Sequence, residues 1–170
     1  MGYSLVCYIL QIKDRHNGNI MLTRDGTIIH IDFGYVLGDT PKMAKVPIFN
    51  ERAPMKLTQE YWDVFGGWGG RATEFLELFE KGFEICREHR EEIALIVEQG
   101  IKVTSAEGGK ERSGKKARAV AEGILRRLEG GGRTRRERQE FIKELVAYAL
   151  NDWSTSTYDW LQRSLNGYTV

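Results

Sequence analysis

Apolar residues near the start of the chain recur at helical spacing. Leu5, Tyr8, Ile9 and Ile12 stand at the i, i+3, i+4 and i+7 positions of one helix face. This pattern predicts a helix over residues 3–12 whose apolar face is buried. The polar residues that follow would then form a loop directly after this helix.

Two short apolar and β-branched runs come next, at residues 20–23 and 27–31. Asp25-Gly26 lies between them and is a strong signal for a two-residue hairpin loop. Such a loop would place Asn19 opposite Asp32, with facing Cα atoms about 4.5–5.5 Å apart. The hairpin would thus set an amide oxygen beside a carboxylate, and hard oxygen ligands of this kind suit Mg²⁺.

In the second half of the chain, apolar residues recur at the spacing of a helix. Thr58 is placed to cap a helix that Gly66-Gly67 would end, and Thr134 to cap a helix that reaches about Leu150. Between these two helices, further apolar residues at helical spacing predict buried faces. The residues that define these faces are Phe75, Leu76, Phe79, Phe83, Cys86, Ile93, Ile96 and Val97.

Two segments lack such periodicity. Residues 35–56 contain all 3 prolines of the chain and predict an irregular loop. Residues 100–116 are rich in glycine, serine and lysine and predict a mobile loop, followed by a short helix over residues 117–128 that Gly130-Gly131-Gly132 would end. The predicted fold class is mainly α with a short β-hairpin.

Composition narrows the class of protein. The chain has 170 residues, of which 41% are hydrophobic and 29% charged, as expected of one globular domain with a real core. No apolar run approaches the roughly 20 residues that a membrane-spanning helix needs. The 2 cysteines lie in apolar helical patterns, which indicates buried thiols in a reducing compartment.

Charge is unevenly distributed although the formal net charge is only +1. Residues 107–138 hold 11 Lys or Arg and 5 Asp or Glu, a local net charge of 11 − 5 = +6. Such a cluster either contacts anionic lipid or forms an ordinary solvated helix face. Aromatic residues are not interleaved with the basic ones, so we predict no nucleic-acid partner.

The candidate chemistry lies in residues 14–34, which read D-R-H-N-G-N-I-M-L-T-R-D-G-T-I-I-H-I-D-F-G. In kinases a catalytic aspartate precedes a metal-binding asparagine by five residues, and the aspartate of D-F-G holds Mg²⁺. Asp14, Asn19 and Asp32 follow the same spacing. We therefore interpret the segment as the metal-binding half of a phosphoryl-transfer site.

Several residues of this segment have roles that chemistry suggests. His16 is the predicted general base, because histidine titrates near neutrality, and Asp14 would orient it or share that task. Arg15 either braces the loop or contacts phosphate. Gly18 supplies a positive φ, a close approach to a ligand, or an ordinary turn. His30 is either a structural histidine or a phosphate contact.

The combination D-R-H-N-x-N followed by H-I-D-F-G resembles the phosphatidylinositol 3-/4-kinase superfamily, whereas protein kinases carry His-Arg-Asp. Lys13 before D-R-H, Gly18 in N-G-N, and K-L-T-Q-E-Y-W-D-V-F-G-G at residues 56–67 resemble its 4-kinase branch, closest to type III beta-like enzymes. The ending N-D-W-S-T-S-T-Y-D-W-L-Q-R-S-L-N-G looks similar to that branch as well.

This resemblance implies the C-terminal lobe of the protein-kinase-like lipid-kinase fold over residues 1–170. Residues 13–19 would form the catalytic loop, residues 32–57 the activation loop, and residues 58–170 the helical remainder. The N-terminal lobe, with its phosphate-covering loop and ATP-contacting lysine, is expected to be absent. We therefore expect the isolated chain to be inactive.

The resemblance also implies ligands and partners. ATP and Mg²⁺ would serve the transfer of a phosphoryl group to phosphatidylinositol, supported by Arg15, His30, Phe33 and Gly34. The activation loop would contact the lipid headgroup, and its candidate residues are Lys42, Lys45 and Lys56. Its charge excess is only +2, which suits an unphosphorylated headgroup better than a bisphosphate, although a solvated loop with routine charge is the alternative.

The C-terminal segment and the cellular setting follow from the same resemblance. Trp160 and Tyr168 either contact the membrane, where amphipathic aromatic rings are favoured, or pack within the fold. The protein would be cytoplasmic and bound peripherally to intracellular membranes of the Golgi type. Three alternatives stay open, namely a 3-kinase lobe, a related large protein kinase with H-N-G-N in place of the usual H-P-S-N, and a non-catalytic lobe.

Overall fold

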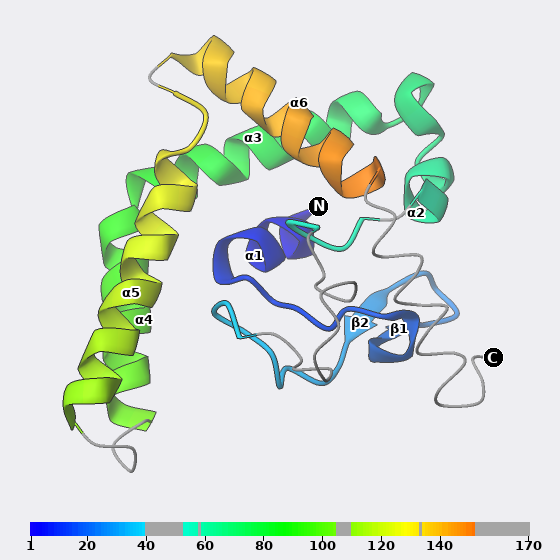
Figure 1. The fold of residues 1–170 in the computed structure, drawn as a ribbon. Helices are drawn as coiled ribbons and strands as arrows, with labels where there is room; N and C mark the ends of the chain where they lie inside the picture. Colours follow the sequence, from blue (N-terminus) through cyan, green and yellow to red (C-terminus); the bar gives the residue numbers. More distant parts are fainter. Residues whose placement is uncertain (40–52, 58, 105–109, 133, 152–170) are drawn as a thin grey trace.

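The computed structural model describes residues 1–39, 53–57, 59–104, 110–132 and 134–151, and Figure 1 shows how their elements are arranged. The mainly α fold class with one short antiparallel hairpin is confirmed for this part of the chain. The helices and strands are α1 (Gly2–Leu10), β1 (Ile20–Leu22), β2 (Ile28–His30), α2 (Gln59–Val64), α3 (Ala72–Glu88), α4 (Arg90–Thr104), α5 (Lys110–Glu129) and α6 (Arg135–Asn151).

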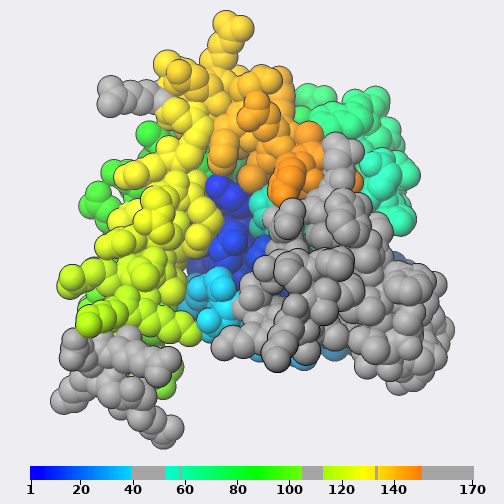
Figure 2. Space-filling view, viewed as in Figure 1, coloured from blue at the N-terminus to red at the C-terminus, as the bar shows by residue number. Residues whose placement is uncertain are grey.

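Helix α1 lies at the centre of the molecule and carries the apolar face that its sequence predicts. Leu5, Tyr8, Ile9 and Ile12 are all at most 6% exposed. In the space-filling view (Figure 2) α1 is visible between α5 in yellow and α6 in orange. The helix ends at Gln11, which adopts a left-handed conformation with φ of 49°, so the chain turns sharply before residues 13–19, the predicted catalytic loop.

Helices α3 and α6 form a layer over α1, and they lie side by side at the top of Figure 1. Phe79 and Phe83 of α3 and Val146 of α6 are completely buried. Ion pairs between Glu80 and Arg135 and between Glu84 and Arg138 join the two helices along the edge of this apolar contact. The layer is therefore held together by apolar packing with a charged border.

Helix α6 begins as its sequence predicts. The Thr134 hydroxyl accepts a hydrogen bond from the Glu137 amide at 3.2 Å, and the Glu137 carboxylate accepts one from the Thr134 amide at 2.8 Å. This reciprocal pair is a capping box, which satisfies two amides that the first turn of a helix leaves without partners. Gly131 and Gly132, with φ of 86° and 83°, make the preceding turn.

The prediction of a mobile loop over residues 100–116 is wrong for most of this range. Helix α4 continues to Thr104 and α5 begins at Lys110, so only residues 105–109, which lie outside the described part, separate them. The two helices run antiparallel as an arm at the left of Figure 1, and Ile101 and Ala117 are buried there. Tertiary packing therefore overrides the low helix propensity of the glycines in this stretch.

The same arm corrects a second expectation about burial. Ile96 was predicted to lie on a core face with Ile93 and Val97, but its side chain is 71% exposed. Ile93 and Val97 do pack against the core. The two-helix arm covers only one side of α4. The apolar residues at helical spacing therefore span a wider stripe of this helix than the stripe that is buried.

The hairpin forms where it was predicted, but its register is shifted by one residue. Ile20 pairs with His30 and Leu22 with Ile28, so Asn19 does not lie opposite Asp32. The Gly26 amide donates to the Thr23 carbonyl at 3.1 Å, and Gly26 has a φ of 85°. These features make a three-residue loop that ends in a left-handed glycine, in place of the two-residue loop that Asp25-Gly26 suggests.

None of the helices in the described part of the chain is long and apolar enough to cross a membrane.

Candidate phosphoryl-transfer site

Asp14 and His16 lie together at the start of the catalytic loop, directly after the turn that ends α1. The His16 Nε2 atom is 3.9 Å from the Asp14 Oδ1 atom, and both side chains are 14% exposed. Asp14 has a positive φ of 62°, which is unusual for a residue other than glycine and is often found where side chains are placed for function. The loop therefore holds a carboxylate and an imidazole side by side at the surface.

The orientation of His16 follows from a hydrogen bond to the backbone. His16 precedes the 3₁₀ turn η1 (Asn17–Asn19), and its Nδ1 atom accepts from the Gly18 amide at 3.1 Å. Because Nδ1 acts as acceptor, a neutral ring carries its proton on Nε2, the atom that faces Asp14. The hydrogen bond thus assigns Nε2–H as the donor of this imidazole.

Gly18 owes its place in the loop to the same ring. A Cβ atom on Gly18 would lie 2.9 Å from the Cε1 atom of His16, closer than side-chain carbons approach one another. Gly18 does not have a positive φ among the described backbone angles. Of the possibilities that the sequence left open, the structure favours a close approach, and the group approached is the His16 imidazole.

Arg15 is buried beneath this loop, and its guanidinium bonds to three backbone carbonyls. Its Nε atom donates to the Lys13 carbonyl at 3.0 Å and one terminal nitrogen to the Ile31 carbonyl at 2.8 Å, while the other contacts the Asp32 carbonyl. The side chain is 1% exposed, and its guanidinium lies 5.3 Å from the centre of the Phe33 ring. These contacts favour the bracing role over phosphate contact.

Arg15 therefore joins the catalytic loop to the end of β2, the segment that carries Asp32. Phe33 is 50% exposed and covers the guanidinium from one side. Asp32 has a φ of 56°, and its Oδ1 atom accepts from the Gly34 amide at 3.1 Å. This left-handed turn interrupts the alternation of side chains between the two faces of the hairpin. The hairpin register therefore does not determine the direction of the Asp32 carboxylate.

Asn19 ends the 3₁₀ turn η1 directly before β1, and its backbone meets Ile31 rather than Asp32. Its carbonyl accepts from the Ile31 amide at 3.0 Å, and its side-chain Nδ2 atom donates to the Asp14 carbonyl at 2.9 Å. The amide nitrogen is thus engaged by the catalytic loop, which leaves the Oδ1 atom as the metal-binding candidate. Asn19 is 7% exposed, so its position is closely fixed.

These donors fit Mg²⁺ better than a soft or all-protein metal site. The described residues contain no cluster of three or more His, Cys, Asp or Glu side chains suited to a metal ion. Mg²⁺ is usually held by one or two protein oxygen ligands, with phosphate oxygens and waters completing its shell. An Asn19 amide oxygen and an Asp32 carboxylate oxygen would meet that requirement.

His30 lies at the end of β2 and is packed against the first turn of α1. Its ring stacks on Tyr3 with centroids 3.4 Å apart and planes inclined by 20°. Burial, and then the nearby Arg15 charge, lower the pKa of His30 to about 4. The ring is therefore neutral at pH 7, and its stacking favours the structural role over phosphate contact.

The remaining predicted site residues are less well placed. Lys56, a candidate for headgroup contact, is 7% exposed and lies in a buried segment rather than at the surface. Lys42, Lys45, Trp160 and Tyr168 lie outside the described residues. The structure therefore joins Asp14, His16 and Asn19 by direct contacts, and Arg15 contacts the backbone of Asp32.

Lys13 is a residue whose contacts the sequence did not suggest. Its ammonium donates to the Ala53 carbonyl at 2.7 Å, and the side chain is buried. The available signal was its position one residue after Ile12, at the end of a buried apolar face, where a lysine needs a polar partner.

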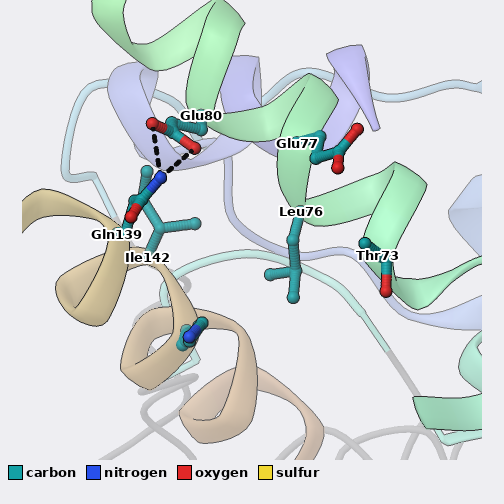
Figure 3. A pocket seen from close by; sticks show the side chains of 7 residues that line it. Thr73, Leu76, Glu77, Glu80, Gln139 and Ile142 are labelled. Carbon is teal, nitrogen blue, oxygen red and sulfur yellow. Dashed lines mark hydrogen bonds between the residues drawn. The ribbon is translucent and has the colours of Figure 1, made fainter. Parts of the chain in front are cut away.

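A separate cavity of ≈ 340 Å³ lies between α3 and α6 and contains none of these residues. Figure 3 shows Leu76 and Ile142 facing it, with Glu80 bonded to Gln139 at its edge. Its lining mixes charges of both signs with two apolar side chains. The candidate chemistry therefore depends on the loop and hairpin and not on this cavity.

Comparison with known proteins agrees with this geometry. The family model described as "Phosphatidylinositol 3- and 4-kinase" matches residues 1–107, which include the predicted catalytic loop, the hairpin and the predicted activation loop at residues 32–57.

Among similar proteins, phosphatidylinositol 4-kinase beta 2 of Arabidopsis thaliana is 39% identical over 98% of this chain, which covers 14% of that protein. Phosphatidylinositol 4-kinase of Dictyostelium discoideum is 38% identical, with 98% and 13% covered. Phosphatidylinositol 4-kinase beta of Danio rerio is 35% identical, with 98% and 19% covered. The chain spans less than a fifth of the length of these relatives, but its match to the family model covers more than half of its own residues, and it belongs to the phosphatidylinositol 3- and 4-kinase family.

Proposed function

We propose that this chain forms the acceptor and metal side of a phosphatidylinositol 4-kinase, which transfers the γ-phosphoryl group of ATP to the inositol headgroup of phosphatidylinositol. The observation that carries the proposal is that Asp14 contacts both His16 and Asn19, while the buried Arg15 beside it in sequence contacts the backbone carbonyl of Asp32. Since the chain spans 13–19% of its relatives, the activity is proposed for it as part of a longer catalytic domain.

The proton of the attacking hydroxyl passes to Asp14 in this proposal. His16 Nδ1 already accepts the Gly18 amide, so the neutral ring presents a proton on Nε2 and has no second acceptor. The Asp14 carboxylate is the acceptor in the pair, and His16 orients it from 3.9 Å. This reverses the roles that residue chemistry alone suggests.

Asn19 and Asp32 would hold Mg²⁺ through one amide oxygen and one carboxylate oxygen. When bound, the ion neutralises charge on the phosphates during transfer. Arg15 ties the segment that carries Asp32 to the start of the loop that carries Asp14, because its guanidinium bonds to the carbonyls of Lys13 and Ile31. Positioning and charge neutralisation are the main sources of catalysis in this class of reaction.

The 4-kinase branch and the lipid acceptor are supported by the names of the relatives and by charge. The relatives in plants, Dictyostelium and vertebrates are named phosphatidylinositol 4-kinases. The segment at residues 35–56 has a formal charge excess of only +2, one unit of which is the buried Lys56, and this low charge suits a headgroup without further phosphates. We propose accordingly that the protein acts at the surface of intracellular membranes.

The test measures transfer of labelled phosphate from ATP to phosphatidylinositol vesicles by a catalytic domain that contains this chain. Asp32→Ala should lower turnover by roughly a hundredfold to a thousandfold or more without changing the thermal melting curve. Asp25→Ala, on the exposed hairpin loop, is the matched control and should stay within about twofold of the parent. An unchanged rate for Asp32→Ala would remove Asp32 from the metal site.

Two further measurements decide the roles and the branch. Asp14→Asn should lose more turnover than His16→Asn, whereas the opposite order would return the base to His16. Chromatography of the deacylated product should identify the 4-phosphate. A 3-phosphate product would assign the protein to the other branch of the family.

A further inference from the structure

Lys13 stands between the end of α1 and Asp14, and its polar groups bond to three different segments. Its backbone amide donates to the Tyr35 carbonyl at 2.9 Å, and its carbonyl accepts from the Arg15 Nε atom at 3.0 Å. Its ammonium donates to the Ala53 carbonyl at 2.7 Å. The side chain is only 6% exposed, so these contacts are made inside the protein.

The two segments that Lys13 joins are distant in sequence. The first, residues 35–39, follows Asp32-Phe33-Gly34 and is also held by a hydrogen bond of 2.8 Å from the Leu37 amide to the Leu10 carbonyl. The second, residues 53–57, enters the core, where Ala53, Met55 and Leu57 are at most 3% exposed. Both therefore meet at the end of α1, next to the catalytic loop.

We propose that Lys13 is a positioning residue that links residues 35–39 through its backbone amide and residues 53–57 through its ammonium to the start of the loop that carries Asp14, and so sets where the acceptor lipid is presented to the carboxylate. The inference rests on the proposed function, because the segment between these two ends is the one proposed to meet the lipid headgroup. Lys13 itself does not touch the reacting atoms. It acts through Tyr35, Ala53 and Arg15.

A lysine is suited to this position for reasons of length and charge. Its ammonium carries three donors on a flexible stem, so it can reach the Ala53 carbonyl from a backbone that is itself bonded to Tyr35. Methionine has a similar length but no donor. Lys13→Met would therefore keep most of the packing and leave the buried Ala53 carbonyl without this ammonium.

The structure offers a control lysine that contacts the other of the two segments. The Lys116 ammonium lies 2.8 Å from the Asp39 carboxylate, and the two side chains are 52% and 59% exposed. Exposed ion pairs of this kind contribute little, because water screens them. Lys116→Met thus removes an equivalent group that reaches residues 35–39 from the surface.

The first experiment uses the 170-residue chain and hydrogen–deuterium exchange, so that it does not depend on kinase activity. Lys13→Met should raise exchange of peptides over residues 53–57 by about tenfold or more, with α3 and α6 unchanged and Lys116→Met close to the parent. No change at residues 53–57 would overturn the proposal. A rise spread equally over all helices would also overturn it, since that indicates a general loss of stability.

The second experiment separates the two substrates in a catalytic domain that contains this chain. Lys13→Met should raise the KM for phosphatidylinositol by about fivefold or more while the KM for ATP stays within about twofold, and Lys13→Arg should recover part of the loss. An equal rise in both constants would overturn the proposal. If the parent transfers no phosphate to lipid, the proposed function fails, and this acceptor role of Lys13 fails with it even where exchange changes as expected.

Discussion

The site region and the helical layer of this protein are stabilised in different ways. In the layer of α3 and α6, large apolar side chains such as Phe79, Phe83 and Val146 are completely buried. In the hairpin the apolar side chains are largely exposed, with Leu22 at 72% and Met21 at 46%. The hairpin therefore gains little from apolar burial, although it carries residues of the candidate site.

What holds the site region is a set of hydrogen bonds from buried cations to backbone carbonyls. Arg15 contacts the carbonyls of Lys13, Ile31 and Asp32, and Lys13 contacts that of Ala53. Helices satisfy their own backbone groups, whereas irregular segments need donors from elsewhere. Lys13 and Arg15 are such donors here, and they bond to irregular backbone from inside the protein without covering its outer side.

The largest expected effect is in the helical layer. Phe79→Ala removes a ring that is 0% exposed and should lower the free energy of unfolding by about 3–5 kcal/mol, as for other large-to-small core substitutions. Leu78→Ala on the same helix is the control, because Leu78 is 42% exposed and should cost about 1 kcal/mol or less. Urea unfolding monitored by circular dichroism measures both, and equal losses would contradict the comparison.

An intermediate effect is expected for the polar network of the site region. Arg15→Met keeps much of the volume but removes the donors to three carbonyls, and we expect a loss of about 2–3 kcal/mol. The loss should be accompanied by faster hydrogen exchange in the hairpin. Arg126→Met, at a residue whose side chain is 71% exposed, should change stability by less than about 0.5 kcal/mol. A neutral Arg15→Met would show that the hairpin is held by other contacts.

The contrast between the two regions also explains what could be predicted from sequence. Buried helix faces follow from periodicity, so α1 and α3 were found with their inward residues, and α6 was found with its cap at Thr134. The arm of α4 and α5 was missed over residues 100–104 and 110–116, because the packing of one helix on the other stabilises helix in a segment with weak propensity. Local patterns do not record that kind of long-range contact.

In the site region, motif spacing singled out Asp14, His16, Asn19 and Asp32 as candidates, and the structure gives contacts among the first three and from Arg15 to the Asp32 backbone. The register of the hairpin was wrong because Thr23 and a left-handed Gly26 form a three-residue loop, which the dipeptide Asp25-Gly26 does not reveal. The contact from Lys13 to Ala53 joins residues 40 positions apart, and the position of Lys13 after a buried helix face does not reveal which residue is its partner. Geometry of this kind follows from tertiary contacts and needs the structure.

The smallest expected effect tests how the hairpin is attached to α1. The pKa of His30 is about 4, below its ordinary value of 6.5, so the unfolded chain binds more protons than the folded one between these two pH values. His30→Phe keeps an aromatic ring against Tyr3 but cannot titrate. Stability of the parent relative to this variant should therefore be fully present above about pH 6.5 and fall as the pH drops towards 4. Because the ring is only partly buried, we expect the difference to change by about 1 kcal/mol between pH 7 and pH 5.

Urea unfolding at both pH values measures it, and His89→Phe allows the general effect of losing a histidine to be subtracted. A difference that is independent of pH would mean that His30 is accessible to protons in the folded state, and that stacking on Tyr3 does not close this end of the hairpin against α1.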